Sequence, residues 1–264
     1  MRSEIVTLDA ERGVTLTTFI QPVDGEFDGV TARPAVLILP GGGYHYCSDR
    51  EADPVAFPYL AAGYQAFVLR YSVGDHSAWP RPLDDYEQAM SLIAANADSW
   101  HLDPEKVAVI GFSAGGHLAA VAATMSAHRP AAAVLGYPVI LPSDADACQL
   151  GMPYPAEHVG EGTPPCFLFH ARDDTTTVVQ NTLTFATALG DAGVPFEAHV
   201  YAYGSHGFAT GAAHLNARLL PARARNWVQD SIAWLDDMLG PLTASGVGEP
   251  LSAPSRVALG ATRR

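Results

Sequence analysis

Residues 107–118 read V-A-V-I-G-F-S-A-G-G-H-L, an apolar run that gives way to Gly-Phe-Ser-Ala-Gly and then to helix-forming sequence. We expect a buried strand over Val107–Ile110, a sharp turn at Ser113 and a helix over Ala114–Ala127. A strand that runs directly into a helix is the unit from which parallel sheets are built, so this stretch predicts an α/β fold.

The glycines on either side of Ser113 indicate that the turn serves chemistry. Gly111 and Gly115 stand where a Cβ would crowd the crossing of strand and helix. A serine on such a turn has a strained backbone, and its hydroxyl is raised clear of the sheet at the positive end of a helix. This arrangement is typical of a nucleophile elbow.

The rest of the chain repeats the alternation of strand and helix. Further strands are expected over Glu4–Leu8, Val14–Ile20, Ala35–Leu39, Gln65–Arg70, Ala131–Leu135, Cys166–His170 and Phe196–Tyr201. Further helices are expected over Asp53–Ala62, Asp84–Ala97, Val178–Gly190 and Ala222–Leu239. This order predicts a mostly parallel central sheet of about eight strands with helices on both faces.

The length of 264 residues suits one large α/β domain, which we assign to residues 1–240. Within it, residues 137–165 carry six prolines and three glycines and show no clean period. We interpret them as an irregular excursion over the active-site end of the sheet, with a cap as one form it could take. Residues 241–264 are rich in Pro, Ser, Gly and Ala, which predicts a flexible tail or, alternatively, an arm laid on a partner subunit.

Composition excludes several classes of function. The net charge of −13 repels phosphates and argues against nucleic acid as a partner. No apolar stretch has the length of a membrane span, and no apolar segment typical of a signal peptide is visible before the first strand, so we expect a cytoplasmic protein without membrane contacts. The three cysteines lack metal-ligand spacing and are interpreted as free thiols: Cys47, Cys148 and Cys166.

A serine nucleophile needs a base and a carboxylate that orients the base. Side chains at the carboxyl ends of parallel strands gather at one edge of the sheet. His206 lies in a glycine-flanked loop after the strand that ends at Tyr201, and Asp173 and Asp174 follow the strand that ends at His170. We favour Asp174 as the orienting acid and expect the other carboxylate to face solvent or a backbone amide.

The loop after the strand Ala35–Leu39 predicts the second catalytic element. Its three consecutive glycines allow backbone amides to turn towards a reacting carbonyl oxygen. We expect an oxyanion hole formed by the amide of Gly42 or Gly43 together with that of Ala114, the residue after the nucleophile. A phosphate cradle is disfavoured because neither a Walker motif nor G-x-G-x-x-G is present.

Two residues after the glycine run are candidates for binding substrate. Tyr44 and His45 are placed to line the pocket, and an aromatic ring there could stack on a sugar, although a packing role is an equal alternative for the tyrosine. His117 lies one helical turn after Ser113, where we expect it to pack beneath the elbow and bond a backbone carbonyl.

With these residues assembled, the chain resembles the α/β-hydrolases, and within them the esterase/lipase group that includes acetyl xylan esterases and related carbohydrate acetylesterases. Pro40 stands where many relatives have histidine, and Thr175–Val179 replaces a common Val-Pro, which leaves the packing of the acid loop open. The segments that carry the resemblance are Pro40–Tyr44 with Ser48 and Glu51, Leu60–Tyr64, Leu102–Val107, Gly111–Leu118, His170–Asp174 and Gly204–Phe208.

The resemblance implies hydrolysis of short-chain, acetyl-type carboxylic esters through an acyl-enzyme, with an acetylated sugar such as a xylo-oligosaccharide as the substrate. This chemistry needs no metal and no organic cofactor. Three alternatives stay open: a general short-chain carboxylesterase on non-sugar esters, a serine peptidase-like hydrolase, and a non-catalytic binding protein on the same fold. Assembly into a homo-oligomer, which is frequent in this group, is open as well.

Overall fold

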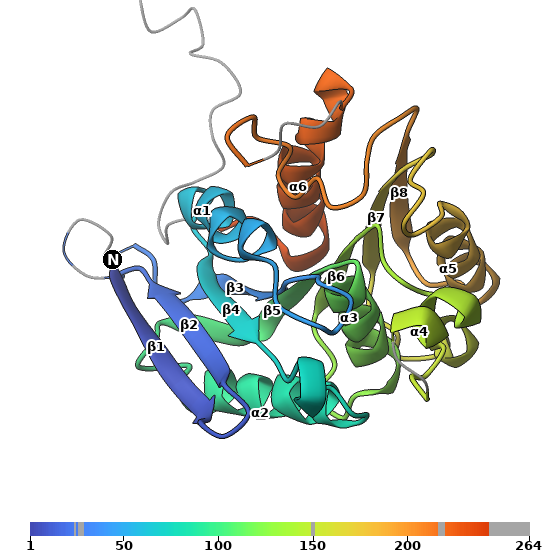
Figure 1. Cartoon of the computed structure of the whole chain (residues 1–264). Helices are drawn as coiled ribbons and strands as arrows, with labels where there is room; N and C mark the ends of the chain where they lie inside the picture. Colours follow the sequence, from blue (N-terminus) through green and yellow to red (C-terminus); the bar gives the residue numbers. More distant parts are fainter. Residues whose placement is uncertain (24, 26–28, 149–150, 216–219, 243–264) are drawn as a thin grey trace, which may run out of the picture.

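A twisted sheet of eight strands runs through the molecule, with the strand order β1-β2-β4-β3-β5-β6-β7-β8 (Figure 1). The computed structural model describes all residues except 24, 26–28, 149–150, 216–219 and 243–264. β1 and β2 pair antiparallel, β2 pairs antiparallel with β4, and every later pair is parallel. The predicted sheet is therefore confirmed.

The described elements follow the alternation expected from the sequence. The strands are β1 Arg2–Asp9, β2 Val14–Ile20, β3 Arg33–Leu39, β4 Gln65–Arg70, β5 Leu102–Phe112, β6 Ala132–Gly136, β7 Cys166–Ala171 and β8 Phe196–Tyr201. The α-helices are α1 Asp53–Ala61, α2 Arg81–Ala95, α3 Ala114–Met125, α4 Pro142–Cys148, α5 Gln180–Asp191 and α6 Trp227–Leu239.

Each face of the sheet has its own hydrophobic core, because successive residues of a strand point to opposite sides. On one face, alternate residues of the central strands pack against α2, α3 and α5; Leu37, Val109 and Leu118 are fully buried there. On the other face, Ile38 and Ile110 pack against α1 and α6 (Figure 1). The central strands therefore read as continuous apolar runs, as expected for a doubly covered sheet.

The structure departs from the sequence-based expectations at several element boundaries, of which the start of β5 at Leu102 rather than Val107 is one. The segment 137–165 contains α4 and a short 3₁₀ helix, Pro155–His158, where we expected no regular structure. α2 begins at Arg81 rather than Asp84, because Pro82 is accommodated in the first helical turn. The turn Ala222–Asn226 is 3₁₀ and leads into α6. The predicted tail lies almost entirely outside the described residues.

Parallel strands place their carboxyl ends along one edge of the sheet, and the site residues gather there. The loops that follow β3, β5, β6, β7 and β8 all open at this edge (Figure 1). Within the described ranges, every helix is too short or too polar to traverse a lipid bilayer.

Candidate active site

Ser113 forms the turn between β5 and α3, with φ of 52° and ψ of −117°. This left-handed conformation is costly for a residue with a side chain. The turn is held because the Ser113 N–H donates to the Gly136 carbonyl over 3.0 Å. A Cβ on Gly115 would lie 2.1 Å from the Leu39 carbonyl oxygen, so α3 approaches β3 closely only because glycine stands there.

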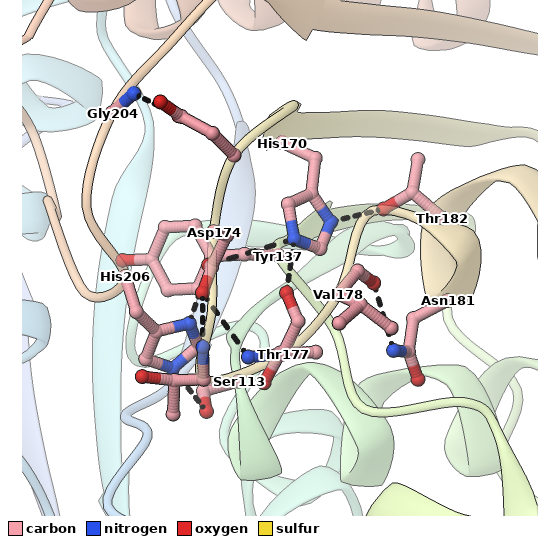
Figure 2. A network of polar contacts seen from close by, with 12 residues as sticks. Ser113, Tyr137, His170, Asp174, Thr177, Val178, Asn181, Thr182, Gly204 and His206 are labelled. Carbon is pink, nitrogen blue, oxygen red and sulfur yellow. Dashed lines mark hydrogen bonds and ion pairs between the residues drawn. The ribbon is translucent and has the colours of Figure 1, made fainter.

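Figure 2 shows His206 between Ser113 and Asp174. His206 Nε2 lies 2.8 Å from Ser113 Oγ, and His206 Nδ1 lies 2.7 Å from Asp174 Oδ2. The loops after β5, β7 and β8 thus bring together three side chains that are far apart in sequence.

Asp174 is fixed as a carboxylate by its surroundings. Its side chain is 1% exposed, and its Oδ1 accepts from the backbone amides of Thr176, over 2.8 Å, and Thr177, over 3.1 Å. His170 Nε2 lies 3.5 Å from the same oxygen that faces His206. Burial raises the pKa of Asp174, but the hydrogen bonds from the histidines and the backbone outweigh burial and hold this pKa well below its ordinary value.

Asp173, the neighbouring carboxylate, has a different hydrogen-bond partner. Asp173 Oδ1 accepts from the Gly204 amide over 2.7 Å, which ties the acid loop to the loop that carries His206 (Figure 2). The two aspartates thus point to different partners, one to an imidazole and one to a backbone amide, as the sequence predicts.

The glycine loop after β3 turns back on itself. His45 N–H donates to the Gly42 carbonyl over 3.0 Å, and the loop passes through positive φ at Gly42 (131°) and Gly43 (62°). The amide of Gly41 donates to Glu51 Oε2 over 3.0 Å. By contrast, no acceptor in the described part of the chain is paired with the amides of Gly42 or Gly43.

A pocket of about 380 Å³ opens beside Ser113 and His206. This volume is in the range of small-molecule sites. Its walls are formed by the glycine loop, the 3₁₀ turn Asp49–Glu51 that precedes α1, α4 and the acid loop. The lining residues are Gly42, Gly43, His45, Tyr46, Ser48, Arg50, Glu51, Ser113, Val139, Asp144, Ala147, Cys148, Thr176, Thr177, His206 and Gly207.

Of the two predicted substrate-binding residues, the pocket contains His45 and not Tyr44. Tyr44 is 1% exposed, packs edge-on against Tyr71 and bonds His117 Nδ1 over 2.8 Å. The expectation for Tyr44 is therefore corrected: its positive φ of 61° turns the side chain into the core beneath the pocket.

His117 lies beneath the elbow, as expected. It is fully buried, and its Nε2–H donates to the Pro153 carbonyl over 2.8 Å, while Nδ1 accepts from the Tyr44 hydroxyl. Burial lowers the pKa of His117 to about 4, so the ring is neutral and links the segment 137–165 to the glycine loop.

Reasoning from the sequence missed the role of Tyr137, the first residue after β6. It is fully buried, and its hydroxyl bonds both Glu51 and the backbone of Ala209. Its position at the end of a central strand was the available signal, since side chains at that edge approach the site. Among the described residues, no group of three or more His, Cys, Asp or Glu side chains is placed to hold a metal ion.

Comparison with known proteins agrees with this architecture. A family model described as BD-FAE matches residues 28–137, and the model of the prolyl oligopeptidase family matches residues 151–241. The chain is 31% identical over 200 residues to an acetylxylan esterase of Xylanibacter ruminicola, covering 67% of this chain and 41% of that protein.

Two solved structures are similar over most of the chain. MGS-M1, an alpha/beta hydrolase enzyme from a Medee basin deep-sea metagenome library, is 42% identical, with a TM-score of 0.83 over 90% of this chain and 98% of that one. The acetyl ester-xyloside bifunctional hydrolase of Caldicellulosiruptor lactoaceticus is 28% identical, with a TM-score of 0.73 over 86% and 89%.

The fold is a mostly parallel sheet covered by helices on both faces, with a serine at a strand-to-helix turn. The chain belongs to the α/β-hydrolase family. It spans about a third to a half of the length of the first curated relatives that it matches.

Proposed function

We propose that this chain is a serine esterase that hydrolyses short-chain, acetyl-type carboxylic esters, with an acetylated carbohydrate as the alcohol half. The observation that carries the proposal is the unbroken hydrogen-bonded series Ser113–His206–Asp174 beside a pocket of about 380 Å³. Serine alone is a weak nucleophile, and this series supplies the base and the orienting carboxylate that it needs.

The proposed reaction proceeds in two steps through an acyl-enzyme. His206 Nε2 removes the proton from Ser113 as Oγ attacks the ester carbonyl, and it then protonates the leaving alcohol. Asp174 accepts from Nδ1–H of His206, which keeps that tautomer of the neutral ring and stabilises the His206 imidazolium when it forms. Water, activated by the same imidazole, then releases the carboxylic acid and restores the serine.

Backbone amides are proposed to stabilise the oxyanion. Gly42 or Gly43 supplies one N–H group and Ala114, at the N-terminus of α3, supplies the other. The proposal is supported by the hydrogen bond of Gly41 to Glu51, which directs one amide of the loop to a carboxylate and leaves its neighbours for the substrate.

The pocket supports a small acyl group on a polar alcohol. Val139, Ala147 and Cys148 form an apolar part of the wall suited to a short acyl chain. Arg50, Asp144 and Thr176 form a polar part suited to the hydroxyls of a sugar. The printed names of two similar proteins, an acetylxylan esterase and an acetyl ester-xyloside hydrolase, point to the same class of substrate.

The test is a panel of p-nitrophenyl esters from acetate to octanoate, together with acetylated xylo-oligosaccharides and peracetylated monosaccharides. We expect turnover that falls steeply beyond short acyl chains, covalent labelling of Ser113 by a serine-directed phosphonate, and loss of both in Ser113→Ala. Absence of turnover and labelling in the unmodified chain would support a binding protein instead. Preference for aryl esters over every acetylated sugar would indicate a general carboxylesterase.

A peptidase is the second candidate, because the prolyl oligopeptidase family model matches residues 151–241. That match covers the acid loop and the His206 loop. Serine esterases and serine peptidases both need such a carboxylate and imidazole to activate the nucleophile. A prolyl p-nitroanilide added to the panel separates the two classes. We expect its kcat/KM to be at least about a thousandfold below that of p-nitrophenyl acetate, equivalent to about 4 kcal/mol of barrier.

A further inference from the structure

A buried carboxylate lies directly behind the glycine loop. Glu51 is 3% exposed; its Oε2 accepts from the Gly41 amide over 3.0 Å, and its Oε1 accepts from the Tyr137 hydroxyl over 2.7 Å. The Tyr137 oxygen in turn accepts from the Ala209 amide over 3.0 Å. These bonds form a continuous path from the glycine loop to the loop that carries His206.

The two ends of this path lie next to the groups that must act together. Gly41 immediately precedes the amides proposed for the oxyanion, and Ala209 follows His206 by three residues. Between them, the Tyr137 ring packs edge-on against the His206 imidazole, with centroids 5.0 Å apart and planes at 67° (Figure 2). The path therefore contacts both the base and the glycine loop.

The backbone is strained to place Tyr137 there. Its φ of 37° lies in the left-handed region, which a bulky residue adopts only where its surroundings impose it. Burial raises the pKa of Tyr137 well above its ordinary value, and the charge of Glu51 raises it further, so the hydroxyl stays protonated and donates.

We propose that Glu51 and Tyr137 are a positioning pair, which fixes the glycine-loop amides relative to the His206 imidazole. The inference rests on the proposed esterase function. It extends that function to two residues that act through the backbone amides and the imidazole and not on the reacting atoms themselves. Its physical basis is that amides stabilise an oxyanion only when they are held in place beforehand, and that a displacement of about 1 Å costs about a hundredfold in rate.

The first experiment compares Tyr137→Phe with Tyr59→Phe in hydrolysis of p-nitrophenyl acetate. Tyr59 is the matched control: it is also fully buried, and its hydroxyl bonds the neutral Ser231 Oγ over 2.7 Å, between α1 and α6. We expect Tyr137→Phe to lower kcat at least about tenfold with KM within about twofold, because binding is kept and alignment is lost. Tyr59→Phe is expected to keep kcat within about twofold.

Glu51 is tested through a conservative rescue. Glu51→Gln keeps an oxygen that can accept from Gly41 but presents an amide to Tyr137, whereas Glu51→Ala removes both acceptors. We expect Glu51→Gln to recover part of the kcat that Glu51→Ala loses. Binding of an alkyl boronic acid, whose tetrahedral adduct occupies the oxyanion site, is expected to weaken in step with kcat/KM.

Amide hydrogen exchange gives a readout that is independent of turnover. In Tyr137→Phe and Glu51→Gln we expect faster exchange in peptides that cover Gly41 and Ala209, and no change there in Tyr59→Phe. If the unmodified chain fails to hydrolyse esters, the proposed function fails while exchange still tests the pair. If Tyr137→Phe does not fold, Glu51→Gln carries both measurements.

The inference is overturned if the folded variants keep kcat and boronate affinity within twofold of the unmodified chain. It is also overturned if Tyr59→Phe loses as much kcat as Tyr137→Phe, or if exchange near Gly41 and Ala209 is unchanged, since either result reduces the pair to ordinary core packing.

Discussion

His117 has a structural role beneath the nucleophile turn. The ring is surrounded by apolar side chains and satisfied by Tyr44 on one nitrogen and the Pro153 carbonyl on the other. A charged ring would reverse the bond to Tyr44, because both nitrogens of an imidazolium donate, and it would place an uncompensated charge in a buried site. Stability is therefore coupled to the neutral form of this residue.

Acidification between pH 6.5 and 4 should destabilise the fold through His117. The unfolded chain takes up a proton near the ordinary pKa of 6.5, while the native ring stays neutral down to a pKa of about 4. The stabilisation is thus complete above pH 6.5 and is lost as the pH falls towards 4, which amounts to about 2 kcal/mol between pH 7 and pH 5.

Urea unfolding at pH 7 and pH 5 measures this effect. His117→Gln can keep both hydrogen bonds without titrating, so it should lose about 2 kcal/mol less than the unmodified chain over that interval. His128→Gln, at an exposed histidine, is the control and should behave like the unmodified chain. An unchanged pH dependence in His117→Gln would contradict the assignment.

The sequence sufficed to place Ser113, Asp174 and His206, because each follows a strand and the ends of parallel strands meet at one edge. It did not suffice for Tyr44 and Tyr137, since in each a positive φ decides where the side chain points. Such a conformation is imposed by tertiary contacts and leaves no mark in the local pattern of a non-glycine residue.

At the scale of elements, α4 is the part that local pattern missed. It is seven residues long and begins at Pro142, and isolated helices of that length are not stable. Its stability comes from α5: Asn181 Oδ1 accepts from the amides of Ile140, over 2.7 Å, and Leu141, over 2.8 Å. A tertiary partner 40 residues away thus determines a helix that the sequence alone does not predict.

Asn181→Ala should loosen this wall of the pocket. Asn181 is fully buried, and its Nδ2 also donates to Asp144 over 2.6 Å, so its removal leaves buried amides without partners at about 1–3 kcal/mol each. We expect lower stability, a raised KM for p-nitrophenyl acetate and a smaller preference for acetate over octanoate, measured by steady-state kinetics and urea unfolding.

Asn96→Ala is the matched control, because the Asn96 side chain bonds a helix carbonyl at the end of α2, outside the lining of the pocket. It should change stability without changing the preference for acyl length. An Asn181→Ala variant with the original preference would show that α4 does not limit the acyl group.

At the scale of the whole molecule, elements from both faces of the sheet support the candidate active site. α6 packs on the face opposite α3, yet Trp227 donates its Nε1–H to the Ala209 carbonyl over 2.9 Å. Its ring stacks on Phe169 with centroids 4.1 Å apart. The loop that carries His206 is thus held by the core on the α6 face, whereas Ser113 leads into α3 on the opposite face.

Trp227→Phe should couple a loss of stability to a loss of rate. Phenylalanine can keep the stacking but cannot donate to Ala209, and the unpaired carbonyl should cost about 1–3 kcal/mol. We expect kcat to fall several-fold as the His206 loop relaxes. Trp234→Phe, on the same helix and packed on Phe167, should lower stability alone. Equal effects on kcat in both variants would contradict the coupling.

Four residues with positive φ that are not glycine lie in or beside the site: Tyr44, Ser113, Tyr137 and Ala209. Each such conformation costs about 1–3 kcal/mol, so the nucleophile turn and the core directly beneath the pocket store conformational energy. Selection for heat tolerance would release that energy most readily by relaxing these turns, and turnover would decline with it. Improvements in durability that preserve activity therefore belong on the distant edge strands and surface helices.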